Sequence, residues 1–285
     1  MFSINEISRN VHQVNTNHKS GFEKWFLLTS DWHYDNPQCN RALLHKHLQE
    51  AKDKDAGIFC FGDLFCAMQG QHDKRRMKGD TMSIHSQPNY FDMLVNEAAE
   101  TLAPFAENIA LISPGNHETA VTKNAGTNLI DRLAQVLNIN TENRVFTGGY
   151  GGYIMFRSQH ESGGNTQITT LKYFHGAGGG GPVTKTAIKH QRAAVNYPDA
   201  DIVYHGHYHD AQQTIFMSEK INKTNNIVKL REQTHISGAS YKEEYEDGFG
   251  GWHVERGASP KPLGGWWLHF KFDGTKIKYN VIRAK

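Results

Sequence analysis

The stretch WFLLTSDWH, residues 25–33, decides the fold because a short apolar run ends abruptly in Asp31 and His33. A continuous apolar run of this length, followed by polar residues, is typical of a strand that is buried on both faces. Residues 40–53 come next, with leucines near helical spacing. The segment therefore predicts a strand followed by a helix, with two polar side chains at the carboxyl end of the strand.

The same arrangement occurs twice more downstream. Residues 57–61 (GIFCF) predict a strand that leads into Asp63, and residues 108–113 (NIALIS) predict one that leads into Asn116 and His117. Alternation of such strands with helices indicates an α/β fold with a parallel sheet. The helices between and after these strands are expected over residues 90–105 and 128–137.

The second half of the chain is richer in strands, and we expect a second, largely antiparallel sheet there. Trp266 and Trp267 are expected to pack in that sheet, and Asp273-Gly274 predicts a hairpin turn. The predicted strands are residues 168–174, 201–204, 212–217, 226–231, 234–237, 266–272 and 277–282.

Length and composition favour one domain over residues 1–285, with variable loops at about 66–88 and 243–265. The formal charge of +2 does not by itself require a polyanionic partner. No segment approaches the roughly 18 apolar residues of a membrane span, so we expect no membrane association. Three sparse cysteines make a poor disulfide framework, and the N-terminal segment lacks the apolar core of a signal peptide. We therefore expect a cytoplasmic location.

Five polar groups share one property, since each comes directly after an apolar, strand-like run. In open α/β sheets the carboxyl ends of strands are where ligands bind, so these groups could converge. Carboxylate, imidazole and amide oxygen together suit divalent Mn, Fe or Zn, and two such ions suit phosphoryl chemistry. The groups are Asp31 with His33, Asp63, Asn116 with His117, His175, and His207 with His209.

The order Asp-x-His, Gly-Asp, Gly-Asn-His-Glu, His, Gly-His-x-His resembles the signature of the calcineurin-like metallophosphoesterases. It extends from Asp31 to His209, with every element in order. The resemblance implies a two-sheet β-sandwich flanked by helices, in a four-layer αββα architecture. It also implies a hydrolase that acts on phosphoric ester bonds. The chain is similar to uncharacterised phosphoesterases of phage and bacterial genomes, which implies the host cytoplasm if a phage encodes it.

The resemblance also implies a role for each residue of the signature. His117 would donate a proton to the leaving oxygen, and Glu118 would orient or polarise His117. Two divalent metal ions are implied, with Mn preferred and Fe, Zn or Ni as alternatives. Their ligands would be Asp31, His33 and His209 for the first ion, Asn116, His175 and His207 for the second, and Asp63 as the bridge.

The substrate is less well defined by the sequence. Residues 62–65 (GDLF) are similar to the second motif of the DNA double-strand-break repair exonucleases, which favours a phosphodiesterase or nuclease that uses a metal-activated water. The substrate would then be DNA, RNA or a nucleotide. The alternatives are a phosphomonoesterase or nucleotide phosphatase and, in another class, a non-catalytic scaffold on the same fold. Arg75 and Arg76 are candidate phosphate contacts, against a plain solvated loop, and Tyr241 is a candidate at the rim of the site.

Overall fold

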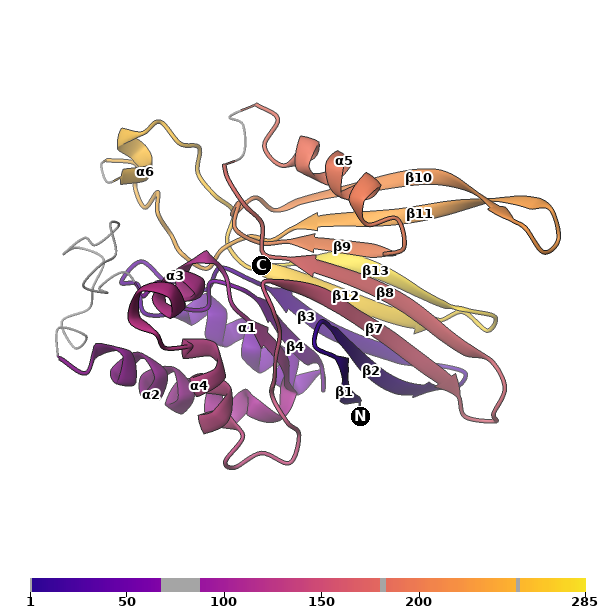
Figure 1. Cartoon of the computed structure of the whole chain (residues 1–285), viewed down its shortest axis with the longest axis horizontal. Helices are drawn as coiled ribbons and strands as arrows, with labels where there is room; N and C mark the ends of the chain where they lie inside the picture. The colour runs from indigo at the N-terminus through magenta and orange to yellow at the C-terminus, as the bar shows by residue number, and fades with distance from the viewer. Residues whose placement is uncertain (1, 68–87, 180–182, 250–251) are drawn as a thin grey trace.

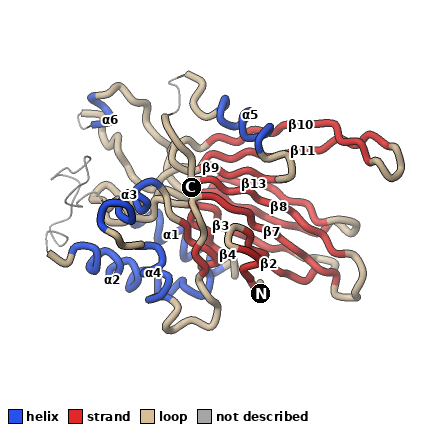
Figure 2. Tube along the Cα trace, viewed as in Figure 1, coloured by secondary structure: helices blue, strands red, loops and turns tan. Residues whose placement is uncertain are grey.

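The structure, a computed structural model, describes residues 2–67, 88–179, 183–249 and 252–285. Two β-sheets form its centre, and the helices lie outside them (Figures 1 and 2). On one side gather the helices α1 (Arg41–Asp53), α2 (Tyr90–Leu102) and α4 (Leu129–Leu137), and on the opposite side lies α5 (Ala187–Asn196). This is the predicted sandwich flanked by helices.

The first sheet has six strands in the order β13-β12-β3-β4-β5-β6. Its centre is parallel, and every residue of β4 and β5 is buried, as expected for strands covered on both faces. The strands are β3 (Glu23–Thr29), β4 (Gly57–Phe61), β5 (Ile109–Ser113), β6 (Phe146–Thr147), β12 (Gly265–Phe272) and β13 (Ile277–Ala284).

The helices over the first sheet have clear sequence boundaries. The Asn40 side chain caps α1 by accepting a hydrogen bond from the backbone of Leu43 at 3.0 Å. Pro104 follows the end of α2, where the chain continues as a short 3-10 helix. The apolar faces of these helices pack with one side of the sheet in a single core. The elements are α1 (Arg41–Asp53), α2 (Tyr90–Leu102), η3 (Ala103–Asn108) and α4 (Leu129–Leu137).

The second sheet has seven strands in the order β1-β2-β7-β8-β9-β11-β10. Helix α5 (Ala187–Asn196) packs against β10 and β11. The strands are β1 (Ser3–Ser8), β2 (Val11–His18), β7 (Gly151–His160), β8 (Thr166–Phe174), β9 (Ile202–His205), β10 (Gln212–Asn222) and β11 (Ile227–Ser237).

Three expectations about the sheets are wrong. The second sheet is mixed, because β2 with β7, β8 with β9 and β9 with β11 all pair in parallel. Strands β12 and β13 belong to the first sheet, where Trp266 lies opposite Leu28. The segments 226–231 and 234–237 form the single strand β11. The predicted hairpin turn at Asp273-Gly274 does join β12 to β13.

An aromatic core holds the two sheets together. Phe61 of β4 stacks on Tyr173 of β8, with ring centroids 4.7 Å apart, and Tyr204 of β9 packs against the same phenylalanine at 5.0 Å. All three side chains are completely buried. The carboxyl ends of β4, β8 and β9 are thereby brought to one place, which is where the site lies. Among the helices in the described part of the chain, none combines the length and apolar composition needed to cross a membrane.

Candidate metal centre

The first group of candidate ligands comes from the ends of β3 and β9. A carboxylate oxygen of Asp31 lies 3.3 Å from Nε2 of His209. Nε2 of His33 lies 3.4 Å from the same His209 nitrogen. Asp31 and His33 are almost completely buried, and ligand atoms of the three residues lie within 4.8 Å of one another. This is the set predicted for the first metal.

The second group comes from the ends of β4, β5, β8 and β9. Nε2 of His175 lies 3.1 Å from a carboxylate oxygen of Asp63 and 3.2 Å from the amide oxygen of Asn116. The ring of His207 lies 5.5 Å from that of His175, and its ligand atom belongs to the same cluster as those of Asp63 and His175. The structure thus brings together all the predicted ligands, in the predicted two sets, and the bridging role of Asp63 stays a prediction.

The donor chemistry of the second group fits a divalent cation. Nδ1 of His175 lies 2.9 Å from the carbonyl oxygen of Phe61, which can only accept, so Nδ1 carries the proton. Nε2 then points its lone pair at the oxygens of Asp63 and Asn116. Three electron-rich atoms directed at one place suit a bound cation, and the Phe61 carbonyl fixes the ring as an outer-shell partner does in metal sites.

The electrostatics of this group favour positive charge. Burial lowers the pKa of His175, but the Asp63 carboxylate outweighs it and raises that pKa to about 10. Burial alone would raise the pKa of Asp63, yet the adjacent His175 and His117 hold it well below its usual value. A position where Asp63 stabilises a proton on His175 is also one where it stabilises a bound metal ion.

The backbone at the candidate ligands is unusual. Positive φ angles of 56°, 47° and 50° occur at Asp31, His33 and Asp63, and of 72° and 53° at His207 and His209. Non-glycine residues rarely adopt this left-handed region, and doing so costs about 1–2 kcal/mol each. Such conformations persist only where the surroundings determine them, and they gather at functional sites.

Two glycines allow these segments to approach one another. A Cβ atom at Gly115 would lie 2.1 Å from a carboxylate oxygen of Asp63 and 2.5 Å from its backbone nitrogen. A Cβ atom at Gly62, where φ is 101°, would lie 2.3 Å from Nδ1 of His175. Only glycine fits at either position without moving a candidate ligand.

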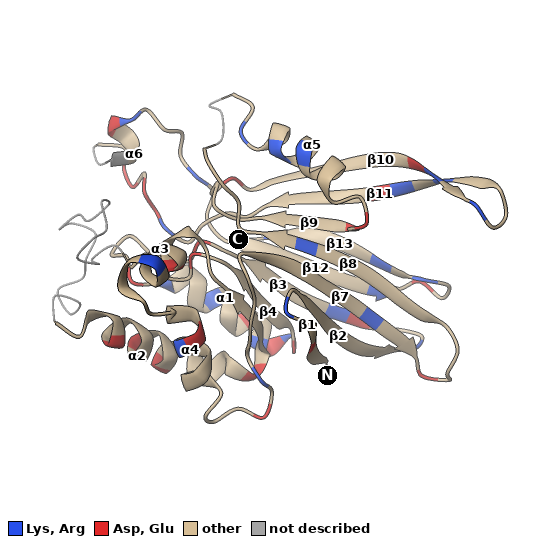
Figure 3. Ribbon diagram, viewed as in Figure 1, with Lys and Arg blue, Asp and Glu red and all other residues tan. Residues whose placement is uncertain are grey.

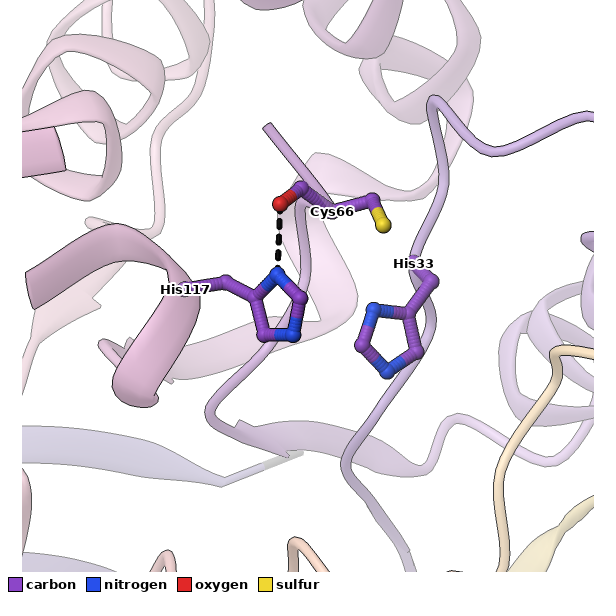
Figure 4. A group of neighbouring side chains, drawn as sticks. All are labelled: His33, Cys66 and His117. Atoms are coloured by element: carbon purple, nitrogen blue, oxygen red, sulfur yellow. Dashed lines mark hydrogen bonds between the residues drawn. The ribbon is translucent and has the colours of Figure 1, made fainter. Parts of the chain in front are cut away.

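His117 lies beside the second group, in the first turn of α3 (Asn116–Ala125). Its backbone N–H donates to Asp63 at 2.9 Å, and its Nε2 lies 3.8 Å from the other Asp63 oxygen. Its Nδ1 donates to the carbonyl oxygen of Cys66 at 2.5 Å (Figure 4). Because Nδ1 carries that proton, Nε2 is the ring nitrogen that is directed toward the metal ligands.

The role expected for Glu118 is wrong. Its two carboxylate oxygens accept hydrogen bonds from backbone N–H groups of Phe65 at 2.8 Å, Gly115 at 2.8 Å and Asp63 at 3.2 Å. Burial and the neighbouring Asp63 raise the pKa of Glu118 to about 8, while the Phe65 and Gly115 bonds oppose that rise. Glu118 therefore holds the Asp63 loop against the start of α3, and the Cys66 carbonyl orients His117.

Asp35 also belongs to the site, but it follows no strand end, so the sequence pattern does not predict it. Its carboxylate accepts from the backbone N–H groups of Cys66 at 2.5 Å and Ala67 at 2.8 Å, and from the Tyr90 hydroxyl at 3.3 Å. Asp35 is 2% exposed. It fixes the peptide whose carbonyl orients His117.

The sequence pattern does not predict Glu244 either, although it lies in the loop expected at 243–265. One of its oxygens lies 3.9 Å from Nδ1 of His209 and 3.0 Å from Nδ1 of His253. The other pairs with Lys242 at 2.6 Å. Glu244 thus stands behind a candidate ligand, as carboxylates commonly do in metal sites.

The candidate substrate residues fare differently. Tyr241 does not lie at the rim of the site, because its side chain is completely buried and its hydroxyl lies 2.9 Å from Nδ1 of His47. Its backbone N–H donates to the carbonyl of Asp31 at 3.0 Å, so Tyr241 holds the backbone of a candidate ligand in place. Arg75 and Arg76 lie outside the described residues.

The fold and the site together define a metal-dependent hydrolase of phosphate esters. The family model for calcineurin-like phosphoesterases matches residues 24–211, which is more than half of the chain. The chain belongs to the calcineurin-like phosphoesterases, hydrolases that act on phosphoric ester bonds with divalent metal ions. A search of curated proteins finds no match.

Several solved structures show a distant likeness. A conserved uncharacterised protein of Streptococcus pneumoniae, predicted to be a phosphoesterase, is 10% identical, with 92% of this chain and 91% of that one covered and a TM-score of 0.34. GAP50 of Plasmodium, an anchor in the inner membrane complex, is 12% identical, with coverage of 92% and 85% and a TM-score of 0.44. Vacuolar protein sorting 29 of Cryptosporidium parvum is 13% identical, with coverage of 92% and 98% and a TM-score of 0.35. At these scores nothing about function follows from the likeness.

Proposed function

We propose that this chain is a dinuclear metal-dependent phosphodiesterase, with a nuclease as the leading form of that activity. The observation that carries the proposal is the convergence of Asp31, His33 and His209 beside Asp63, His175 and His207, with Asn116 completing the second set. Two bound divalent cations, preferably Mn, would supply a water that deprotonates near neutral pH and charge that offsets the phosphate. The chain itself must then hold the ions, orient the ester and move a proton.

His117 is the residue proposed to move the proton. Its Nδ1 proton is held by the Cys66 carbonyl and Nε2 lies 3.8 Å from Asp63, so the ring must be doubly protonated to act as the acid, and the Nε2 proton is the one given to the leaving oxygen. A positioned imidazole of this kind contributes about a hundredfold to ten-thousandfold to such reactions. Glu118 and Asp35 act on the reaction only through the backbone that they hold.

Support for a diester substrate is the GDLF segment at residues 62–65, which is similar to the repair nucleases. In the described part of the chain, Lys and Arg are interspersed with Asp and Glu along the strands (Figure 3). Proteins that bind a long nucleic-acid duplex carry clustered Lys and Arg on one face. The mixing of charges seen here therefore favours a short substrate, or the end of a strand, over a long duplex. A phosphomonoester or a nucleotide is the second candidate.

We further propose one domain over residues 1–285, which the core shared by both sheets supports. The loops expected at 66–88 and 243–265 are proposed to select the substrate, which the contacts of Cys66 with His117 and of Glu244 with His209 support. A cytoplasmic location is also proposed, because Cys39, Cys60 and Cys66 form no disulfide with one another.

A substrate panel with Mn²⁺ tests this function. It compares bis-p-nitrophenyl phosphate, p-nitrophenyl phosphate, single-stranded and double-stranded DNA, RNA and cyclic nucleotides. We expect the diesters to be hydrolysed faster than the monoester. Faster monoester hydrolysis would move the assignment to a phosphatase, and no hydrolysis with two ions bound would favour a scaffold.

A further inference from the structure

A third cluster of metal-binding side chains lies next to the two-metal centre. Cys66, His33 and His117 offer a thiol and two imidazoles whose ligand atoms lie within 4.8 Å of one another. They come from three separate segments, the loops after β3 and β4 and the first turn of α3, and they face a common space (Figure 4). The two groups already described contain only carboxylate, imidazole and amide ligands.

The His33 ring supplies an independent sign that something is bound here. Its Nδ1 is buried and has no hydrogen-bond partner among the described residues, while its Nε2 faces His209. Buried polar atoms are almost always satisfied, so an orphaned ring nitrogen beside a thiol needs an explanation. Figure 4 shows the His33 ring beside the His117 ring, with the Cys66 side chain above the two.

We propose that Cys66, His33 and His117 form an inhibitory site for a thiophilic divalent cation such as Cd²⁺ or excess Zn²⁺. A thiolate with two imidazoles suits such soft or borderline ions, whereas Mn²⁺ and Mg²⁺ favour oxygen-rich sets. Zn–S and Zn–N bonds are about 2.3 and 2.0–2.1 Å long, so an ion between these side chains requires movements of roughly 1 Å. The thiol proton of Cys66 is released to solvent when the cation binds.

Occupation of this site would inactivate the enzyme for two reasons. His33 also belongs to the first metal group, and one neutral imidazole offers a single lone pair. The cation therefore competes with the first metal for His33. It also engages His117, which is the proposed proton donor. Binding at Cys66 is independent of the proposed function, and only the inhibition rests on it.

The other two cysteines are poor competitors for such an ion. Burial raises the pKa of Cys39 to about 12 and that of Cys60 well above its usual value. Neither of them belongs to a metal-ligand cluster in the described part of the chain. Cys39→Ser is therefore a matched control, since it removes one buried thiol outside the site.

Titration of the Mn-loaded full chain with Cd²⁺ tests the site. The ultraviolet charge-transfer absorbance of a cadmium–thiolate bond is followed in wild type, Cys66→Ser and Cys39→Ser. We expect it to saturate at one thiolate-bound Cd²⁺ per chain in wild type and Cys39→Ser, and to be absent from Cys66→Ser. No absorbance in wild type, or equal absorbance in Cys66→Ser, would overturn the proposal. Cys66→Ala provides a second variant, and Mn content verifies that each variant is folded.

Hydrolysis of bis-p-nitrophenyl phosphate gives the second readout, with each protein compared with its own cadmium-free rate. Loss of even an outer-shell partner lowers metal affinity about ten- to a hundredfold. The Cys66 thiolate is a direct ligand, so its loss should weaken cadmium inhibition by at least about tenfold. Equal inhibition of wild type and Cys66→Ser would overturn the inhibitory role. If wild type shows the absorbance with Cd²⁺ yet hydrolyses nothing before Cd²⁺ is added, the cation site stands and the proposed function fails.

Discussion

The carbonyl oxygen of Cys66 accepts a hydrogen bond from Nδ1 of His117 at 2.5 Å. This contact determines which ring nitrogen carries a proton, and it leaves Nε2 3.8 Å from Asp63. A backbone atom in the loop after β4 therefore sets the tautomer of a side chain in the first turn of α3. The chemistry of the site depends on how well that loop is held.

His117→Ala should keep both metals and lose most hydrolysis of bis-p-nitrophenyl phosphate. His117 belongs to neither of the two metal groups, and a positioned general acid is worth about a hundredfold to ten-thousandfold in rate. The measurement is kcat with metal content by elemental analysis. The control is His45→Ala, which removes an exposed histidine from α1. Unchanged turnover would remove His117 from the mechanism.

Asp63→Ala should lose both metals and all activity together, because Asp63 is the predicted bridge and is 2% exposed. Metal stoichiometry of the purified variant is the direct measurement. Asp53→Ala, at the exposed end of α1, is the control and should retain both ions. A variant of Asp63 that still holds two ions per chain would contradict bridging.

Asp35→Asn should lower kcat about ten- to a hundredfold with little change in KM or metal content. Hydrogen bonds to a charged group contribute about 1.5–3 kcal/mol, and the amide that replaces the carboxylate would turn an N–H toward a backbone N–H. The ring of His117 would then lose its fixed tautomer, so the acidic or basic limb of the pH–rate profile should shift. Equal loss of metal and kcat would indicate a structural role instead.

Gly115→Ala should destabilise the protein by about 1–3 kcal/mol and reduce metal content. The added Cβ would lie 2.1 Å from Asp63, so a candidate ligand must move. Chemical denaturation and metal analysis measure the two effects. At Gly149 the same change meets its nearest atom at 3.4 Å, and Gly149→Ala should alter neither quantity.

Acid should destabilise the protein through two buried histidines away from the site. Burial lowers the pKa of His190 and of His235 from 6.5 to about 4. The unfolded chain therefore binds more protons between pH 6.5 and 4, so their contribution to stability is complete above 6.5 and falls as the pH drops through that window. Each residue can account for up to about 3 kcal/mol.

Urea unfolding of the metal-free protein at several pH values measures this effect. His235→Gln should flatten the decline between pH 6.5 and 4, because glutamine has no proton to gain. Gln213→Ala, at an exposed position of β10 that carries no ionisable group, should leave the slope unaltered. An identical slope for His235→Gln and wild type would show that this histidine does not titrate on unfolding.

The parallel centre of the fold could be predicted because its strands are uninterrupted apolar runs. β4 was predicted to the residue, since Gly57–Phe61 is buried throughout. β2 could not be predicted, because its sequence, VHQVNTNH, has few apolar residues and its buried positions include histidines. The prediction that β12 belongs to the second sheet is wrong because its partner, β3, lies far away in the sequence, and no local sequence pattern indicates that pairing.

The candidate ligands could be predicted for the same reason, since each follows a strand end. The roles of Asp35 and Cys66 could not be predicted, because they depend on hydrogen bonds to backbone groups. Asp35 accepts from two backbone N–H groups and the Cys66 carbonyl accepts from His117, and these groups come together only after the loops fold. The error on Glu118 has the same origin. Its place next to His117 in the sequence suggested a side-chain contact, whereas the start of α3 turns it toward the Asp63 loop.

The left-handed backbone at Asp31, His33, Asp63, His207 and His209 has a consequence for how the centre is assembled. We expect the loops that follow the strand ends to impose those conformations as the chain folds, which would put the ligands in position before any cation arrives. Loading would then be limited by diffusion and dehydration of the ion, with no reshaping of the protein. After chelation, the rate of reactivation should rise in proportion to the metal concentration.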